Sequence, residues 1–164
     1  MSPDGCTIRF ARASDVPEMS RLFAELGYDV PVEVLTQRLN AFHEAGEKAI
    51  VAEDASSPGD LLGLATLHLT PVLHRAGPVG RVSALVVDET MRGRGIGRAL
   101  MQRAEQWAAE RGCVLMEVTS NMRRADAHRF YETSGYERTS YRFAKVPRAA
   151  EAPLTDAFSH QTEG

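Results

Sequence analysis

The chain has 164 residues, 43% of them hydrophobic and 25% charged, which suits one soluble domain with a substantial core. Its formal net charge of −3 argues against a broad electrostatic interaction with nucleic acid. No apolar run approaches the length of a membrane span, and we expect no signal peptide at the N-terminus. Cys6 and Cys113 lie far apart without the spacing of metal ligands, so we expect no metal site and two packed thiols in a reducing, cytoplasmic compartment.

The first part of the chain predicts one strand followed by two helices. Residues 7–13 alternate loosely between apolar and polar side chains, as a strand does. Ser14 has the character of an N-cap, and the apolar face that follows at helical spacing predicts a helix that stops near Gly27. After a short connector, a second amphipathic pattern predicts a helix that ends at Gly46.

The middle of the chain predicts three strands. Residues 48–53 and 61–69 are typical of the two strands of a hairpin, because a turn rich in Asp, Ser, Pro and Gly separates them. A loop over residues 70–80 follows. Residues 82–87 then hold three valines, a leucine and an alanine, which predicts a buried strand at the centre of a sheet.

Three glycines in five residues, interleaved with arginines, join this strand to a long amphipathic helix that stops at Gly112. Glycine at such a junction lets the backbone approach a ligand closely, and the first turn of a helix has free N–H groups and a positive dipole end. The stretch therefore predicts a phosphate-binding loop, to which Arg92, Arg94 and Arg98 add charge. A tight turn with solvated arginines is the alternative interpretation.

The loop does not match the two best-known nucleotide motifs. It lacks the Gly-Lys pair and the hydroxyl residue of a Walker loop, and Arg98 stands where a dinucleotide fingerprint requires glycine. The absence of a magnesium ligand set beside the loop argues against a nucleotide-phosphate-binding protein of another fold, although that interpretation stays open.

The last part of the chain predicts a strand, a helix and one or two further strands. Residues 113–119 have a strand pattern, and a turn then leads into a helix that Gly135 stops. Residues 136–146 alternate well enough for one or two strands. The pattern is lost from Pro147 onward, so we expect residues 147–164 to form a flexible C-terminal tail.

Two stretches resemble motifs of the GNAT acyltransferase superfamily. Arg92, Gly95 and Gly97 match its motif A, which reads Arg or Gln, two residues, Gly, one residue, and Gly or Ala. Residues 129–136 resemble motif B, and both the spacing of the motifs and the order of elements over residues 8–146 are those of the family. The resemblance implies a single GNAT-like domain over residues 1–146 with an α+β, three-layer α/β/α fold. Its mixed, mostly antiparallel sheet would have six to seven strands splayed at the central strand, with about four helices.

The resemblance also implies an acetyl-CoA-dependent N-acetyltransferase that acetylates a primary amine of a small molecule or peptide by direct attack in a ternary complex. The loop would hold the pyrophosphate of acetyl-CoA, and the end of the central strand would pair with the pantetheine arm. The residues assigned to cofactor binding on this basis are Leu85, Val86, Val87, Arg92, Gly93, Arg94, Gly95, Ile96, Gly97, Arg98 and Asn121.

Tyr131 aligns with the tyrosine that serves as general acid toward the leaving thiolate in similar enzymes. A phenol with an ordinary pKa of about 10 is protonated at neutral pH and can give that proton away. The alternatives are a core tyrosine at this position and, for Asn121, an asparagine that only forms a turn.

A general base is harder to identify. Many relatives carry a glutamate on the central strand shortly before the loop, whereas residues 81–84 contain no carboxylate. The candidates are Glu117, His68 and His74, although a free amine and ordered water would suffice. Three acids near the first connector would attract a protonated amine or are ordinary solvated side chains: Glu25, Asp29 and Glu33.

The missing glutamate also keeps a second function open, a CoA-binding regulatory module without catalytic activity, against which Tyr131 argues. The expected partners are acetyl-CoA and an amine acceptor, without nucleic acid or membrane. The sequence does not identify the acceptor, and it is compatible with a homodimer.

Overall fold

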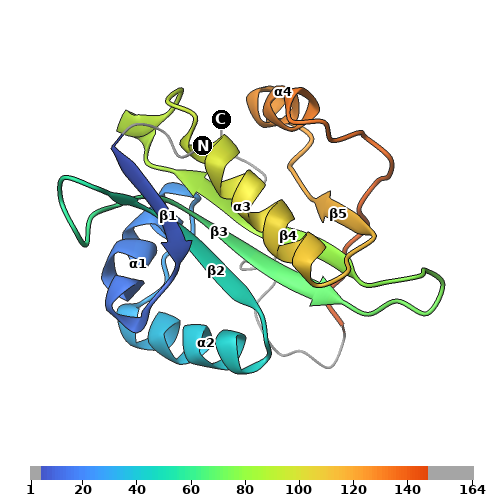
Figure 1. Cartoon of the computed structure of the whole chain (residues 1–164), viewed down its shortest axis with the longest axis horizontal. Helices are drawn as coiled ribbons and strands as arrows, with labels where there is room; N and C mark the ends of the chain where they lie inside the picture. Colours follow the sequence, from blue (N-terminus) through green and yellow to red (C-terminus); the bar gives the residue numbers. More distant parts are fainter. Residues whose placement is uncertain (1–4, 148–164) are drawn as a thin grey trace. The chain divides into compact units, whose positions relative to one another are not determined.

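The computed structural model describes residues 5–147, which form two compact units that divide after Val118. The first unit holds a five-stranded sheet and three helices, which are α1 (Val16–Glu25), α2 (Val32–Glu44) and α3 (Ile96–Glu110). The second unit holds α4, Ala125–Thr133 (Figure 1).

The strands of the first unit lie side by side in their order along the chain. They are β1 (Cys6–Phe10), β2 (Lys48–Asp54), β3 (Leu61–Thr70), β4 (Val79–Val87) and β5 (Leu115–Val118). The first four pair antiparallel, and β5 pairs parallel with β4. The prediction of a mixed, mostly antiparallel sheet is therefore confirmed.

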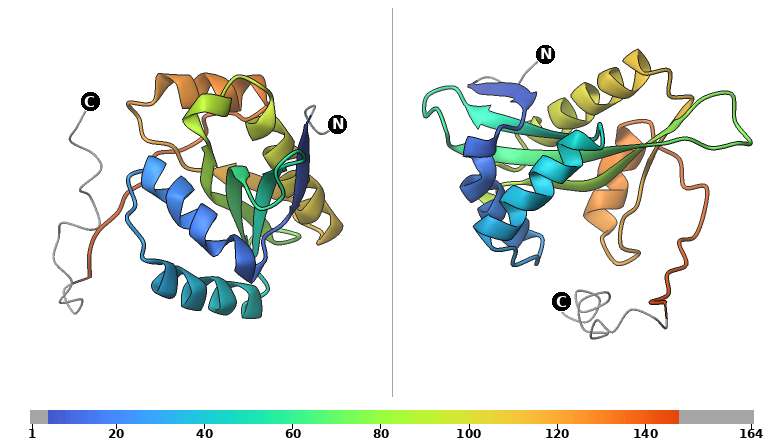
Figure 2. Two further views of the ribbon diagram at one scale, coloured as in Figure 1. Left: turned by 90° about the vertical axis from the view of Figure 1, so that its left-hand side faces the viewer. Right: turned by 90° about the horizontal axis from the view of Figure 1, so that it is seen from below.

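The helices of the first unit cover both faces of its sheet, so this unit has three layers. Figure 2 shows α1 and α2 on one face and α3 on the other. Met19 and Leu22 of α1 and Leu35 and Leu39 of α2 pack into one buried cluster with sheet residues that include Leu64. The apolar stripe that predicted α3 is buried too, with Leu100, Ala104, Trp107 and Ala108 all 1% exposed or less.

The entry into α1 differs in detail from the sequence prediction. A short 3-10 helix, Ala13–Asp15, precedes it, and Asp15 rather than Ser14 is the N-cap residue. The carboxylate of Asp15 is only 3% exposed and accepts two hydrogen bonds from Arg9, at 2.7 and 2.8 Å. Arg9 also donates to Glu53 on β2, which ties the start of α1 to the sheet.

The central strand β4 is irregular at the point where the pairing changes. Its register with β5 runs only from Val79 to Val82, so Ala84 to Val87 pair with β3 alone among the strands of this unit. Thr66 of β3 lies opposite Ala84 and Leu67 lies opposite Val82, which leaves Ser83 as the extra residue of a β-bulge.

The prediction of six to seven strands is wrong for the part of the chain that the structure describes, which has five. Residues 136–146, expected to add one or two, form none there. Alternation describes a half-buried strand face, but burial requires a covering layer, and Tyr141 and Phe143 are 78% and 93% exposed. The expected four helices are present. Apart from Pro147, the predicted tail lies outside the described residues.

Among residues 5–147, no helix has both the length and the apolar composition that crossing a membrane would require.

Candidate active site

The glycine-rich loop connects β4 to the N-terminus of α3. Gly93 and Gly95 have φ angles of 78° and 82°, in the left-handed region that glycine adopts without strain, and Gly95 is the N-cap of α3. The Ala99 N–H donates to the Gly95 carbonyl at 3.0 Å, so the amides of residues 96–98 precede the first helical hydrogen bond. The loop thus presents the N–H groups of a helix N-terminus beside glycine residues, whose lack of a side chain lets a ligand come close. This is the geometry of an anion site.

Side chains from α1 hold the start of this loop. Arg21 donates to the carboxylate of Asp88 at 2.7 Å and to the Leu61 carbonyl at 2.7 Å. Hydrogen bonds from Thr90, and then from Arg21, hold the pKa of Asp88 below its ordinary value despite the opposing effect of burial. Glu25 accepts the Glu89 N–H at 3.0 Å, so this acid, which the sequence offered as a candidate for attracting the acceptor, anchors the loop.

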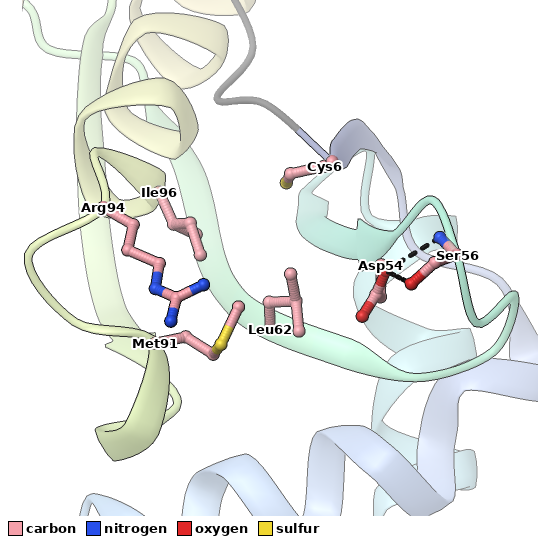
Figure 3. Close-up of a pocket in the computed structure, with 8 residues that line it drawn as sticks. Cys6, Asp54, Ser56, Leu62, Met91, Arg94 and Ile96 are labelled. Atoms are coloured by element: carbon pink, nitrogen blue, oxygen red, sulfur yellow. Dashed lines mark hydrogen bonds between the residues drawn. The ribbon is translucent and has the colours of Figure 1, made fainter.

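The three arginines of the loop are all exposed. Arg92 folds back along the strand end, where its Nε donates to the Val87 carbonyl at 3.2 Å. Arg94 points into a cavity of about 210 Å³ that Ile96 and Met91 also line (Figure 3). Asp54 and Ser56 lie on the opposite wall, and the Asp54 carboxylate accepts the hydrogen bonds of the Ser56 N–H and hydroxyl. Two of the predicted cofactor residues, Arg94 and Ile96, therefore line one cavity beside the loop.

The predicted pantetheine strand, residues 85–87, lies directly before the loop. Its residues pair with residues 63–65 of β3, and Val86 is 4% exposed. Alternate residues of an antiparallel strand direct their N–H and C=O groups toward opposite neighbours. Because β5 does not reach this far, the groups directed away from β3 have no strand partner within the first unit.

Asn121 and Tyr131 belong to the second unit. The Asn121 side-chain oxygen accepts the Arg123 N–H at 3.0 Å, so this residue does form the turn that was its alternative role. The Tyr131 ring packs edge-on against Phe130 and Tyr136. Burial raises the pKa of the Tyr131 phenol, while Arg124 opposes the shift, and the net result keeps the hydroxyl protonated at neutral pH.

The sequence profile of the acetyltransferase (GNAT) family matches residues 13–136, well over half of the chain, and this range includes both the glycine loop and Tyr131. The chain belongs to the GNAT acetyltransferase family. The two motifs predicted an acetyl-CoA-dependent acyltransferase with acetyl-CoA as the acetyl donor. The family match confirms both predictions.

Individual relatives agree with this membership. An aminoalkylphosphonate N-acetyltransferase of Salmonella typhimurium is 41% identical over 88 residues, which is 54% of this chain and 57% of that protein's length. An aminoglycoside N(6')-acetyltransferase of Stenotrophomonas maltophilia is 28% identical over 138 residues, 81% of this chain and 87% of the relative. A solved aminoglycoside N-acetyltransferase in complex with CoA has a TM-score of 0.77 at 17% identity and covers 87% of this chain and 95% of its own, which shows a shared fold.

Two of the three base candidates have partners in this GNAT chain. Glu117 on β5 accepts a hydrogen bond of 2.7 Å from Arg81 on β4. These two residues and His74 line a second cavity of about 240 Å³, at the end of β4 away from the glycine loop. His68 on β3 has its Nε2 atom 2.7 Å from the hydroxyl of Ser83.

Sequence reasoning missed Ser83 as a site residue. Residues 81–84 contain no carboxylate, and no role was predicted for Ser83. No signal within residues 81–84 points to it, because the bulge is defined by the register between β3 and β4.

Proposed function

We propose that the protein transfers the acetyl group of acetyl-CoA to a primary amine of a small molecule or peptide, by direct attack of the amine in a ternary complex. One observation carries the proposal. Within a single compact unit, the glycine loop at the N-terminus of α3 directly follows a stretch of β4, Ser83 to Val87, whose second edge has no strand partner there.

The loop binds the pyrophosphate in this proposal. The N–H groups of residues 96–98 donate to phosphate oxygens, and Gly93, Gly95 and Gly97 leave room for the phosphates to approach the backbone. Arg92, Arg94 and Arg98 neutralise the charge of the phosphates with forked donors.

The free edge of β4 binds the pantetheine arm. Backbone groups of Leu85, Val86 and Val87 that point away from β3 pair with the amides of the arm, in the way that an added strand pairs with a sheet edge. Asn121 contributes its side-chain N–H₂ group to the arm, because its side-chain oxygen already accepts a hydrogen bond.

The chemistry requires a polarised carbonyl and a protonated leaving group. A backbone N–H of β4 donates to the thioester oxygen, which gains negative charge as the amine attacks. The C–N bond forms, the C–S bond breaks, and Tyr131 gives its proton to the departing thiolate. The raised pKa of Tyr131 keeps that proton in place until the thiolate forms.

The relatives favour a small polar amine as acceptor. Their names specify aminoalkylphosphonate, aminoglycoside and glucosamine 6-phosphate acceptors. The test measures release of the CoA thiol from acetyl-CoA with a panel of such amines, together with polyamines, amino acids and peptides. Amine-dependent thiol release is expected. Tight CoA binding without release by any amine would instead favour a regulatory CoA-binding module.

Two further expectations belong to the same proposal. Cys6 and Cys113 are free thiols in the structure, which supports a reducing, cytoplasmic setting. A homodimer stays a prediction, and light scattering coupled to size-exclusion chromatography would measure the molar mass that decides it.

A further inference from the structure

Four polar side chains lie in a row next to the bulge of β4, and hydrogen bonds join three of them. They are Glu47, Thr66, His68 and Ser83. The Ser83 hydroxyl lies 2.7 Å from Nε2 of His68 and 2.8 Å from the Thr66 hydroxyl. On the other side of the imidazole ring, Nδ1 lies 3.8 Å from the carboxylate of Glu47. No step of the acetyl transfer described above uses this row.

The backbone explains why these residues meet. Thr66 and His68 are two positions apart on β3, so their side chains share one face of the sheet. The bulge leaves Ser83 without a residue opposite it and turns its side chain toward that same face. Glu47 precedes β2, and its carboxylate is held by the Leu69 N–H at 2.9 Å. The ring of Phe42 on α2 packs edge-on against His68 at 4.9 Å between centroids.

A Ser83 hydroxyl that donates to Nε2 requires the tautomer of His68 that carries its proton on Nδ1. A carboxylate beside Nδ1 favours a proton on that atom, which leaves the lone pair of Nε2 to accept the Ser83 hydroxyl proton. The Thr66 hydroxyl then donates to the Ser83 oxygen, which keeps one lone pair for a further donor. Ser83 is exposed, so a substrate ammonium group can reach it.

Two charged groups face His68 from neighbouring elements. Glu47 comes from the turn before β2, and Arg81 lies directly opposite His68 in the register of β3 and β4. Arg81 is already paired with Glu117 of β5. Helix α2 contributes the uncharged ring of Phe42.

We propose that Ser83 and His68 form a proton relay that deprotonates the acceptor ammonium, with Glu47 as the residue that positions the imidazole. The inference rests on the proposed acetyl transfer. Ser83 lies two residues before Leu85, roughly 7 Å along the strand, and thus beside the stretch assigned to the thioester arm. The relay takes the place of the glutamate that residues 81–84 lack.

The proton balance closes without another reactant. The ammonium gives one proton to the Ser83 oxygen as Ser83 gives its own to Nε2 of His68. The neutral amine attacks the thioester carbonyl, the C–N bond forms, and the C–S bond breaks. The second amine proton is lost as the amide forms and balances the proton that Tyr131 gives to the thiolate. The imidazolium of His68 finally releases its proton to water.

The test is the pH profile of kcat/KM for two amines of different pKa, measured with the wild-type protein and with His68→Gln. The wild-type inflection is expected at one pH for both amines, because an enzyme group removes the proton. His68→Gln is expected to lose roughly a hundredfold in kcat/KM at pH 7 and to acquire an inflection that follows each amine. Ser83→Ala should behave in the same way, and Ser83→Thr, which keeps the hydroxyl, should recover most of the activity.

His74→Gln is the matched control, because it removes a histidine from the second cavity and should leave the profile unchanged. Unchanged acetyl-CoA affinity and melting temperature in His68→Gln exclude misfolding as the cause of a loss. A wild-type inflection that follows each amine, or a His68→Gln profile equal to that of the wild type, would overturn the relay alone. Wild-type protein that binds acetyl-CoA but acetylates no amine would overturn the proposed function and the relay with it.

Discussion

The glycine loop and the Ser83 bulge flank the same short stretch of β4, but different kinds of sequence information specify them. The loop depends on local backbone conformation, since the positive φ angles of Gly93 and Gly95 and the first turn of α3 lie within a few residues. The row at the bulge joins Glu47, His68 and Ser83, which meet only through the pairing of three strands. A local motif can be read from the sequence, whereas a row across strands requires the register.

The largest expected effect is at the loop. Gly97→Val should abolish acetyl-CoA binding, because the side chain would occupy the space through which phosphates reach the helix amides, and Gly95→Val should do the same. The wild-type protein at a ligand concentration of about a hundred times Kd should gain roughly 2.7 kcal/mol in its free energy of unfolding. Thermal unfolding with and without acetyl-CoA measures this gain, which the valine variants should lack.

A matched pair separates ligand exclusion from backbone strain. Gly93 and Gly46 have φ angles of 78° and 83°, and a Cβ added to either would meet no atom within 4 Å. Gly93→Ala and Gly46→Ala should therefore destabilise the free protein equally, by about 1 to 2 kcal/mol, while only Gly93→Ala weakens acetyl-CoA binding. Equal affinities in the two variants would show that Gly93 does not approach the ligand.

The next effect concerns the leaving group. Tyr131→Phe should lower kcat by roughly a hundredfold to ten-thousandfold and change the affinity for acetyl-CoA little, because the thiolate appears only as the C–S bond breaks. Single-turnover rates and equilibrium binding of acetyl-CoA measure the two quantities separately. An unchanged single-turnover rate would return Tyr131 to its alternative role as a core residue.

Carboxylates that serve the fold should respond to pH differently from the relay. Hydrogen bonds from Arg9, followed by the Gly59 N–H, lower the pKa of Glu53 to about 2. Because the pKa of Glu53 is lower in the folded than in the unfolded protein, its ionised form stabilises the fold. This contribution is complete above the unfolded-state pKa, near 4.3, and is lost as the pH falls toward 2.

Glu53→Gln should therefore lower the urea midpoint at pH 7, and its deficit relative to the wild type should shrink between pH 5 and pH 2. The pH profile of kcat/KM should keep its inflection, since Glu53 takes no part in the relay. A deficit that stays constant down to pH 2 would mean that the charge of Glu53 does not stabilise the fold.

The features that could be predicted from the sequence are the local ones, and those that could not depend on contacts between distant segments. The helices, the five strands and the glycine loop were predictable, because periodicity and glycine placement act over short distances. The strands expected in residues 136–146 were not, since the alternation around Tyr141 and Phe143 does not say whether a neighbouring strand or a covering layer is present.

At the site, the sequence identified His68 as one of three base candidates but could not rank them. Their ranking depends on partners that are distant in sequence, such as Ser83, 15 residues away, and Glu47. It likewise offered Glu25 as a candidate for attracting the acceptor, whereas its side chain accepts the Glu89 N–H of the loop, 64 residues away. In each case the sequence gives the identity of the side chain but not the groups that this side chain contacts.

The smallest expected effect is that of replacing Glu117, the one carboxylate among the three candidates for the general base. Arg81 and Glu117 form an ion pair whose side chains are 49% and 39% exposed. Exposed pairs contribute about 0 to 1 kcal/mol, so Glu117→Gln should change the free energy of unfolding by less than about 1 kcal/mol. It should also leave the pH inflection of kcat/KM where the wild type has it, because a carboxylate engaged by Arg81 is not the base in the relay. If Glu117→Gln instead removes the inflection while His68→Gln keeps it, the base lies on β5 and the row at the bulge serves only to hold β3 and β4 together.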